Sequence, residues 1–186
     1  MLLLLSILAG LVLAIALGGK PKRLLDVRLR ASQCVLLALA VQVVLFSRLG
    51  PHVPGLLQRP LHLASYGLLL AFATANLRVR ALSPLLLGIL LNFLAIAANA
   101  GRMPLSTAAA TTAGLDPAAT ANTSLSAQHL SFLGDVFALP SSLPLANAFS
   151  AGDILIGLGM VVFVVATSMK DGGEQIRQVS RASSQS

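Results

Sequence analysis

Three charged side chains in the apolar second half of the chain are of the types that form ion pairs or carry acid–base chemistry: Arg102, Asp135 and Asp153. Asp135 lies in the run FLGDVFALP, where apolar neighbours on both sides predict burial, and a buried acid requires a partner. Asp153 lies where an apolar run begins, and the unpaired amides of a helix start stabilise a carboxylate there. We expect Arg102 to pair with one of the two acids, and the sequence leaves open which one.

Two asparagines lie in the apolar run that precedes Arg102. Asn92 and Asn99 are seven residues apart, so at about 3.6 residues per turn they fall on nearly the same side of a helix. An amide that faces lipid is left unpaired, so we expect both side chains to face the interior of a helical bundle, as interhelical contacts or as part of a pocket. The candidate partners are Gln42, Ser65, Tyr66 and Asn76.

The helix that carries these asparagines is predicted to end near Ala100. Pro104 disfavours a helical conformation in the residue before it, and Gly101 is suited to the left-handed conformation that closes a helix. Arg102 is then presented beside a helix carboxyl end, which favours a cation. The pocket predicted at this rim comprises Tyr66, Asn92, Asn99, Arg102, Asp135 and Asp153.

The remaining reactive residue types lack the spacing of a catalytic or metal site. Cys34 is the only cysteine, which excludes a disulfide framework and a cysteine metal site. The histidines at positions 52, 62 and 129 are isolated, and the pattern G-x-S-x-G does not occur. We therefore predict no cofactor, no metal and no enzymatic activity.

The composition is that of a membrane protein. Hydrophobic residues make up 56% of the chain, charged residues only 10%, and the mean hydropathy is +0.85; soluble domains carry about 25% charged residues. The net charge of +7 does not indicate nucleic-acid binding, because the cations cluster beside apolar runs as orientation signals do. The predicted partners are membrane lipids, together with a larger membrane complex or further copies of the chain.

The predicted fold is all-α, a polytopic membrane bundle with five transmembrane helices. The five apolar stretches are 16 to 19 residues long, and a helix needs roughly 17 to 25 residues to cross a bilayer. Open strands would leave polar backbone groups unpaired in lipid. The spans are predicted at residues 2–17, 31–47, 61–77, 82–99 and 151–169.

The charges predict that the amino terminus is outside and the carboxyl terminus inside. With this orientation, ten of the 13 lysines and arginines are cytoplasmic, and only those at positions 48, 59 and 102 are outside. Residues 1–170 are then a single bundle domain, and the polar residues 171–186 are a flexible cytoplasmic tail. In the outer loop, residues 100–150, the Thr/Ala-rich first half is predicted to be mobile and the apolar second half to fold back onto the bundle.

Several motifs together resemble an uncharacterised family of small bacterial multi-spanning membrane proteins. They are LNFLAIAANAGRMP, FLGDVFALP, LANAFSAGDILIGLG, HLASY and an early GG followed by basic residues; the family patterns are N-G-G-R-M-P, F-L-G-D and N-V-F-S-x-G-D. The resemblance covers the chain outside the Thr/Ala-rich segment and the tail. It differs at Ala100, where the pattern has its first glycine, so a turn that needs two glycines is expected to be reshaped.

The resemblance implies a location in the bacterial inner membrane, and it implies no activity. It also implies a shared arrangement around Asn99, Gly101, Arg102, Met103, Pro104, Asp135, Asn147, Ser150 and Asp153.

The sequence leaves three functions open. The first is a non-enzymatic accessory, scaffold, or lipid- or small-ligand-binding protein with a polar pocket at the outer face. The second is a small transporter or channel component, although the spans contain no central carboxylate and no internal repeat. The third is an outer-leaflet enzyme, in which Asp135 or Asp153 acts as acid or base and Arg102 binds an anionic headgroup.

Overall fold

The chain is mostly helical. The computed structural model describes residues 2–116, 123–125 and 129–169. The polar tail predicted at residues 171–186 lies outside the described residues.

Five helices of 15 residues or more lie within the described part of the chain, one on each apolar stretch of the sequence. Their bounds are α1 (Leu2–Ala16), α2 (Ser32–Phe46), α3 (Gly55–Ala75), α4 (Ser83–Ala98) and α6 (Ala151–Met169). Four agree with the predicted ranges to within one residue. Helix α3 begins six residues earlier than predicted and contains Pro60. Its first turn is tied to the preceding loop, because Nε2 of Gln58 donates to the carbonyls of Gly50 and Val53.

Two helical segments among the described residues are long and apolar enough to cross a membrane, judged by length and composition. They are Arg80–Ala98 and Ala151–Met169, each of 19 residues. Helices α1 and α2 are apolar but shorter. Helix α3 is longer, but its first two turns contain the polar residues Gln58 and Arg59.

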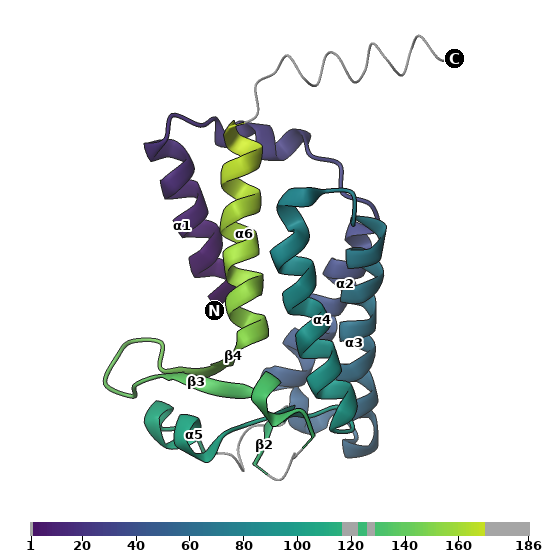
Figure 1. Cartoon of the computed structure of the whole chain (residues 1–186). Coiled ribbons are helices and arrows are strands. Elements are labelled where there is room, and N and C mark those ends of the chain that lie inside the picture. The colour runs from purple at the N-terminus through teal and green to yellow at the C-terminus, as the bar shows by residue number, and fades with distance from the viewer. Residues whose placement is uncertain (1, 117–122, 126–128, 170–186) are drawn as a thin grey trace.

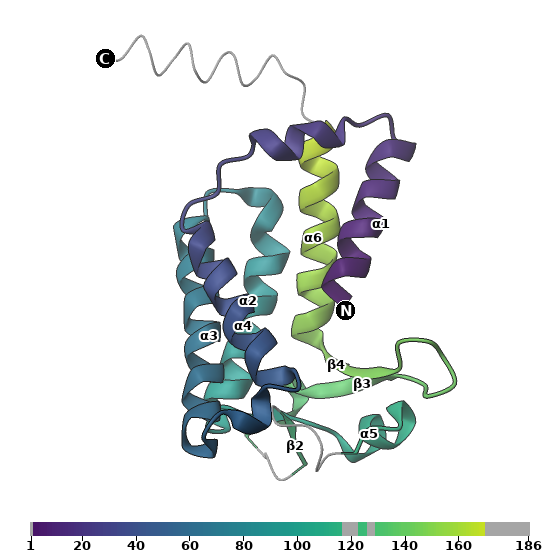
Figure 2. The ribbon, with the colours of Figure 1, turned by 180° about the vertical axis from the view of Figure 1, so that it is seen from behind.

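The helices lie side by side in the order α1, α6, α4, α3, α2, as Figures 1 and 2 show from opposite sides. Helices α4 and α6 approach closely because glycines face the contact. A Cβ at Gly88 would meet the backbone of Gly152, and one at Gly159 would meet the backbone of Leu85. Such contacts between small residues are typical of helices that associate without a hydrophobic driving force.

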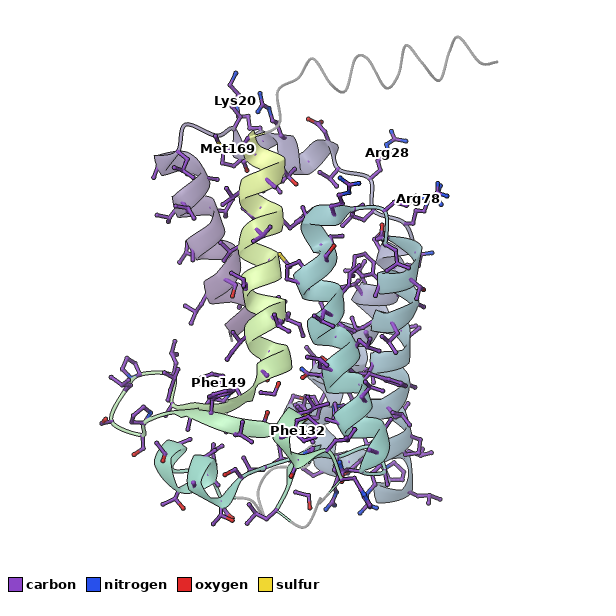
Figure 3. The ribbon with its side chains drawn as sticks, in the orientation of Figure 1. Lys20, Arg28, Arg78, Phe132, Phe149 and Met169 are labelled. Carbon is purple, nitrogen blue, oxygen red and sulfur yellow. The ribbon has the colours of Figure 1, made fainter. Side chains whose placement is uncertain are left out.

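One end of the bundle carries basic residues. Lys20, Arg28 and Arg78 lie at the end where α6 finishes at Met169 (Figure 3). The short helices η1 (Pro21–Asp26) and η3 (Arg80–Leu82) also lie at this end. Arg23 donates from Nη1 to the carbonyl of Ser168 at 3.0 Å, which places a cation against the carboxyl end of α6.

The opposite end is closed by a small mixed subdomain, which we call the cap (the described residues of 103–150). It contains strands, so the all-α prediction is wrong here. Its elements are β1 (Met103–Pro104), α5 (Thr107–Ala113), β2 (Thr123–Ser124), η4 (Ser131–Leu133), β3 (Asp135–Leu139) and β4 (Asn147–Ser150). A further short helix, η2 (Gly50–His52), joins α2 to α3.

The Thr/Ala-rich half of the outer loop, predicted to be mobile, contains helix α5. The side chain of Ser106 accepts from the amide of Ala109 and caps its start, and Gly114 ends it with φ +64°. Its alanines pack on the β3–β4 hairpin in a cluster with Leu105 and Ala148. The predicted folding back of the second half is realised as this hairpin, which lies across the lower end of α6 in Figure 1.

The register of the hairpin determines which polar residues meet. Strands β3 and β4 are antiparallel, with Asp135 opposite Ser150 and Phe137 opposite Phe149. The two phenylalanine rings stack with centroids 5.8 Å apart. Because Ser150 immediately precedes α6, this register brings Asp135 to the start of that helix and close to Asp153.

Candidate functional site

The start of α6 is closed by reciprocal bonds between Ser150 and Asp153. The amide of Asp153 donates to Oγ of Ser150, and the amide of Ser150 donates to Oδ2 of Asp153, both at 3.0 Å. This is a capping box, in which two side chains satisfy amides that the helix leaves unpaired. Asp153 therefore acts as the helix-start residue that the sequence predicts.

Asn92 connects this capping box to α4. Its Nδ2 donates to Oδ1 of Asp153 and its Oδ1 accepts from the hydroxyl of Ser150, both at 2.8 Å. A Cβ at Gly152 would collide with Oδ1 of Asn92, so glycine is required for this approach. Asn92 is 1% exposed, as predicted for an interior amide, and it also interacts with the hydroxyl of Tyr66. Each of its hydrogen bonds to the uncharged partners contributes about 1 kcal/mol, and the bond to the carboxylate about 1.5–3 kcal/mol.

The other polar residues considered as partners for the asparagines form separate contacts. Gln42 donates from Nε2 to Oγ of Ser65 at 3.1 Å and so links α2 to α3. At the basic end of the bundle, Oδ1 of Asn76 accepts from the amide of Arg30 and Nδ2 of Asn76 donates to the carbonyl of Arg30.

His62 on α3 is held by the turn that follows α4. Its Nδ1 lies 2.7 Å from the carbonyl oxygen of Gly101. A carbonyl can only accept, so Nδ1 must carry the hydrogen, and in the neutral ring Nε2 is an acceptor. Phe46 and Tyr66 contact the imidazole edge-on, with centroids 5.2 and 5.5 Å away.

The turn that presents this carbonyl uses two consecutive left-handed residues. Ala100 has φ 52° and Gly101 has φ 89°. Ala100 stands where the family pattern has glycine, and a non-glycine residue in this left-handed conformation costs roughly 1–2 kcal/mol. Gly101 cannot be replaced in the same way, because a Cβ there would meet the backbone of Arg59.

A cavity of about 200 Å³ lies where the bundle meets the cap. Helices α3, α4 and α6 contribute to its wall from one side, and strands β1 to β4 from the other. Its lining comprises His62, Tyr66, Asn92, Ile96, Met103, Leu115, Thr123, Asp135, Asn147, Ala148 and Asp153.

Asp135 is the more deeply buried of the two acids that line the cavity. It is 9% exposed, and its carboxyl has no hydrogen-bond partner among the described residues. Burial, together with the charge of Asp153, raises the pKa of Asp135 from 3.8 to about 8. At neutral pH this carboxyl is therefore mostly protonated.

The predicted ion pair between Arg102 and Asp135 or Asp153 does not form in the described part of the chain. Arg102 does not line the cavity, and its Nε is buried without a hydrogen-bond partner. The physical reason is the direction of the chain after the Gly101 turn. Successive side chains of an extended segment point to opposite sides, and Met103 is the residue that faces the cavity.

Asn99 also lies outside the cavity lining. Its Nδ2 donates to the carbonyls of Ala95 and His129, at 2.8 and 2.6 Å, and its Oδ1 accepts from the amide of His129 at 3.1 Å. It therefore attaches the cap to the end of α4 rather than facing a ligand.

Four of the six predicted pocket residues thus line one cavity: Tyr66, Asn92, Asp135 and Asp153. His62 is a lining residue that the sequence reasoning set aside as isolated. His62 lies four residues before Tyr66, so both are on one face of a helix. This spacing indicated that His62 could line the same pocket. Ser150 and Asn147 entered only through the family resemblance, although S-x-x-D before an apolar run is a capping-box signature. Among the described residues, no group of three His, Cys, Asp or Glu side chains is arranged to hold a metal ion.

Bundle, cap and cavity define a mostly helical protein with a polar cavity at the end opposite the larger group of basic residues. A family of unknown function (DUF5317) has a model that matches residues 26–165, and the chain belongs to this family. The predicted membership of an uncharacterised family is thereby confirmed. No curated protein matches the chain. No solved structure matches it either.

The raised pKa of Asp135 predicts that stability falls as pH rises. The folded carboxyl binds its proton more tightly than the unfolded one, so this stabilisation is complete below about pH 3.8 and is lost as pH rises through about 8. We expect the Tm of the full chain in detergent to fall between about pH 6 and about pH 9, and Asp135→Asn to remove most of that fall. The exposed Asp26, at the basic end, provides the control Asp26→Asn. An unchanged pH dependence in Asp135→Asn would show that other groups cause it.

Proposed function

We propose that the protein is a multi-pass protein of the bacterial inner membrane that binds a small ligand at its outer face and does not transform it. In this proposal the five long helices cross the bilayer, and the cap covers their outer ends. The cavity between bundle and cap is the binding site.

The apolar outer surface of the bundle supports the membrane location. Large side chains at positions 4, 8, 12 and 15 of α1 are 59 to 70% exposed and recur at helical spacing. Leu36 and Val43 of α2 are exposed to a similar extent. Contiguous apolar faces of this kind are unfavourable in water and favourable in lipid. Helices α1 and α2 have 15 residues each, fewer than the roughly 20 that a helix needs to span the bilayer. Local thinning of the bilayer and long flanking cations such as Lys20 accommodate this mismatch.

The distribution of cations supports the orientation. Figure 3 shows Lys20, Arg28 and Arg78 at the end where α6 finishes. The connections η1, η3 and the segment that precedes α2 add four more cations at that end, at positions 22, 23, 30 and 80. Three, at positions 48, 59 and 102, lie at the cap end. The positive-inside rule then assigns the cap to the outer face.

The observation that carries the binding function is the carboxyl of Asp135. Asp135 faces the cavity, and burial raises the pKa of its carboxyl to about 8. A ligand in the cavity can therefore hydrogen-bond to this carboxyl or pair with its ionised form. The surrounding polar groups come from three helices and the cap, so a ligand contacts several elements at once.

An outer-leaflet enzyme is the second candidate, favoured by the finding that Asp135 and Asp153 line the same cavity. An acid with a pKa of about 8 is protonated at neutral pH and is suited to donate a proton. A small transporter remains the third candidate. Turnover of a bound molecule by the purified protein, lost in Asp135→Asn, would support the enzyme over the binding protein.

The membrane orientation is testable by thiol labelling. In a Cys34→Ser background, Ser141→Cys places a thiol on the exposed loop of the cap, and Arg28→Cys places one at the basic end. We expect a membrane-impermeant maleimide to label Ser141→Cys in intact cells and Arg28→Cys only after the membrane is opened. The reverse pattern would place the cavity on the cytoplasmic face, and labelling of both in intact cells would contradict the proposed spans.

The binding function is testable with a panel of small solutes. Asn147 lines the cavity and is exposed, so it lies at the mouth. We expect at least one of a set of small cations, anions and neutral polyols to raise the Tm of the purified chain in a saturable manner. Asn147→Trp, which closes the mouth, should abolish this shift, and Asn147→Ala should retain it. If no solute raises the Tm, or if Asn147→Trp responds like the parent, the cavity is not a binding site.

A further inference from the structure

We propose that the ligand group held in this cavity is a compact primary ammonium, carried by a small free amine or by the headgroup of an ethanolamine lipid. This inference rests on the proposed binding function and adds the chemical class of the ligand. It differs from the enzyme alternative raised by the sequence, in which Arg102 would bind an anionic headgroup.

The charges that line the cavity favour a cation. Asp135 and Asp153 are its acidic residues, and no lysine or arginine belongs to its described lining. Arg102 precedes the lining residue Met103 but does not line the cavity itself. An anion would enter beside the Asp153 carboxylate without a compensating cation and would hold Asp135 in its neutral form, which is costly in a partly buried site.

The hydrogen-bonding groups match the three N–H donors of a primary ammonium. The carboxyl of Asp135 has no partner among the residues that the structure describes. The Nε2 of His62 is an acceptor, because Nδ1 donates to Gly101. The Asp153 carboxyl accepts one bond on each oxygen and retains further acceptor capacity. Residues with acceptor capacity therefore line the cavity from α3, α6 and β3.

The size of the cavity limits the ligand to a few non-hydrogen atoms. A volume of about 200 Å³ corresponds to about seven water molecules at ~30 Å³ each, and pockets for drug-sized molecules begin near ~300 Å³. An aminoethyl group fits this space. The phosphate and acyl chains of an ethanolamine lipid would remain outside, toward the membrane.

The aromatic content of the lining favours a primary over a quaternary ammonium. Quaternary ammonium groups have no N–H donors and are held by cages of aromatic rings. Tyr66 is the only Phe, Tyr or Trp ring in the described lining, and it packs against the imidazole of His62 in a T-shaped arrangement. A trimethylammonium would leave the carboxyl of Asp135 without a hydrogen-bond donor.

Binding of a cation also changes the protonation of Asp135. A positive charge beside the carboxyl favours its ionised form, so binding near neutral pH releases a proton from it. The titratable groups around Asp135 are Asp153 on α6 and His62 and Tyr66 on α3. The elements β4, α5 and η4, which pack against β3, carry no charged residue. Affinity for the ammonium should therefore rise with pH by up to about tenfold per unit below the pKa of Asp135.

Calorimetry on the full chain in detergent, with ethanolamine and choline as paired ligands, tests the proposal. We expect saturable binding of ethanolamine, binding of choline at least about tenfold weaker, and an affinity for ethanolamine that rises from pH 6 to pH 7.5. In Asp135→Asn, which removes the charge and keeps the shape, ethanolamine binding should weaken by about tenfold or more and lose its pH dependence. Asp26→Asn should bind as the parent does.

Two bilayer preparations distinguish the sources of the ammonium. Phosphatidylglycerol has no ammonium group, so in nanodiscs of this lipid alone we expect the site to be empty and added ethanolamine to bind. If phosphatidylethanolamine in the nanodisc abolishes that binding, the lipid supplies the ammonium. If the binding persists unchanged, the ligand is a free amine.

The outcomes separate failure of this inference from failure of the proposed function. Equal binding of choline and ethanolamine, or equal binding of Mg²⁺, would overturn the primary-ammonium assignment while leaving a binding site. Binding of phosphate or acetate in place of the amine, blocked by Asn147→Trp, would do the same. Binding of no solute in any arm would remove both proposals.

Discussion

The side-chain amide of Asn92 is the contact on which the junction between bundle and cap depends. It is buried, donates to Asp153 and accepts from Ser150, so it fixes the start of α6 against α4. Because Ser150 is also the last residue of β4, the same bonds set the position of that strand. The hairpin register then carries this position to Asp135. One amide thus determines where both acids of the cavity lie.

The two acids occupy different environments. Both oxygens of Asp153 accept hydrogen bonds, from Asn92 and from the amide of Ser150. The Asp135 carboxyl is more deeply buried and has no such partners among the described residues, so burial raises its pKa to about 8. Asp153 is needed to form the site, whereas Asp135 is available to a ligand. In the orientation proposed for this chain, that available group faces the outer side of the membrane, from which the proposed amine would enter.

The helices were predictable because their signal is local, and the cap was not because its geometry depends on distant pairings. Four apolar runs gave helix ends to within one residue, whereas α3 continues back through Pro60 because Gln58 supports its first turn. Burial of Asp135 was predictable from its neighbours, and its place beside Ser150 required the hairpin register. The expected Arg102 ion pair failed because sequence proximity to the pocket does not determine on which side of the chain a side chain lies.

A double-mutant cycle between Asn92 and Ser150 tests the central contact most directly. The free energies of unfolding of Asn92→Ala, Ser150→Ala and the double variant would be compared with that of the parent chain in the same detergent. A direct buried hydrogen bond in one network predicts a coupling free energy between about 0.5 and 3 kcal/mol. Additive effects, with a coupling near zero, would show that the two side chains do not interact and that the start of α6 is positioned by other contacts.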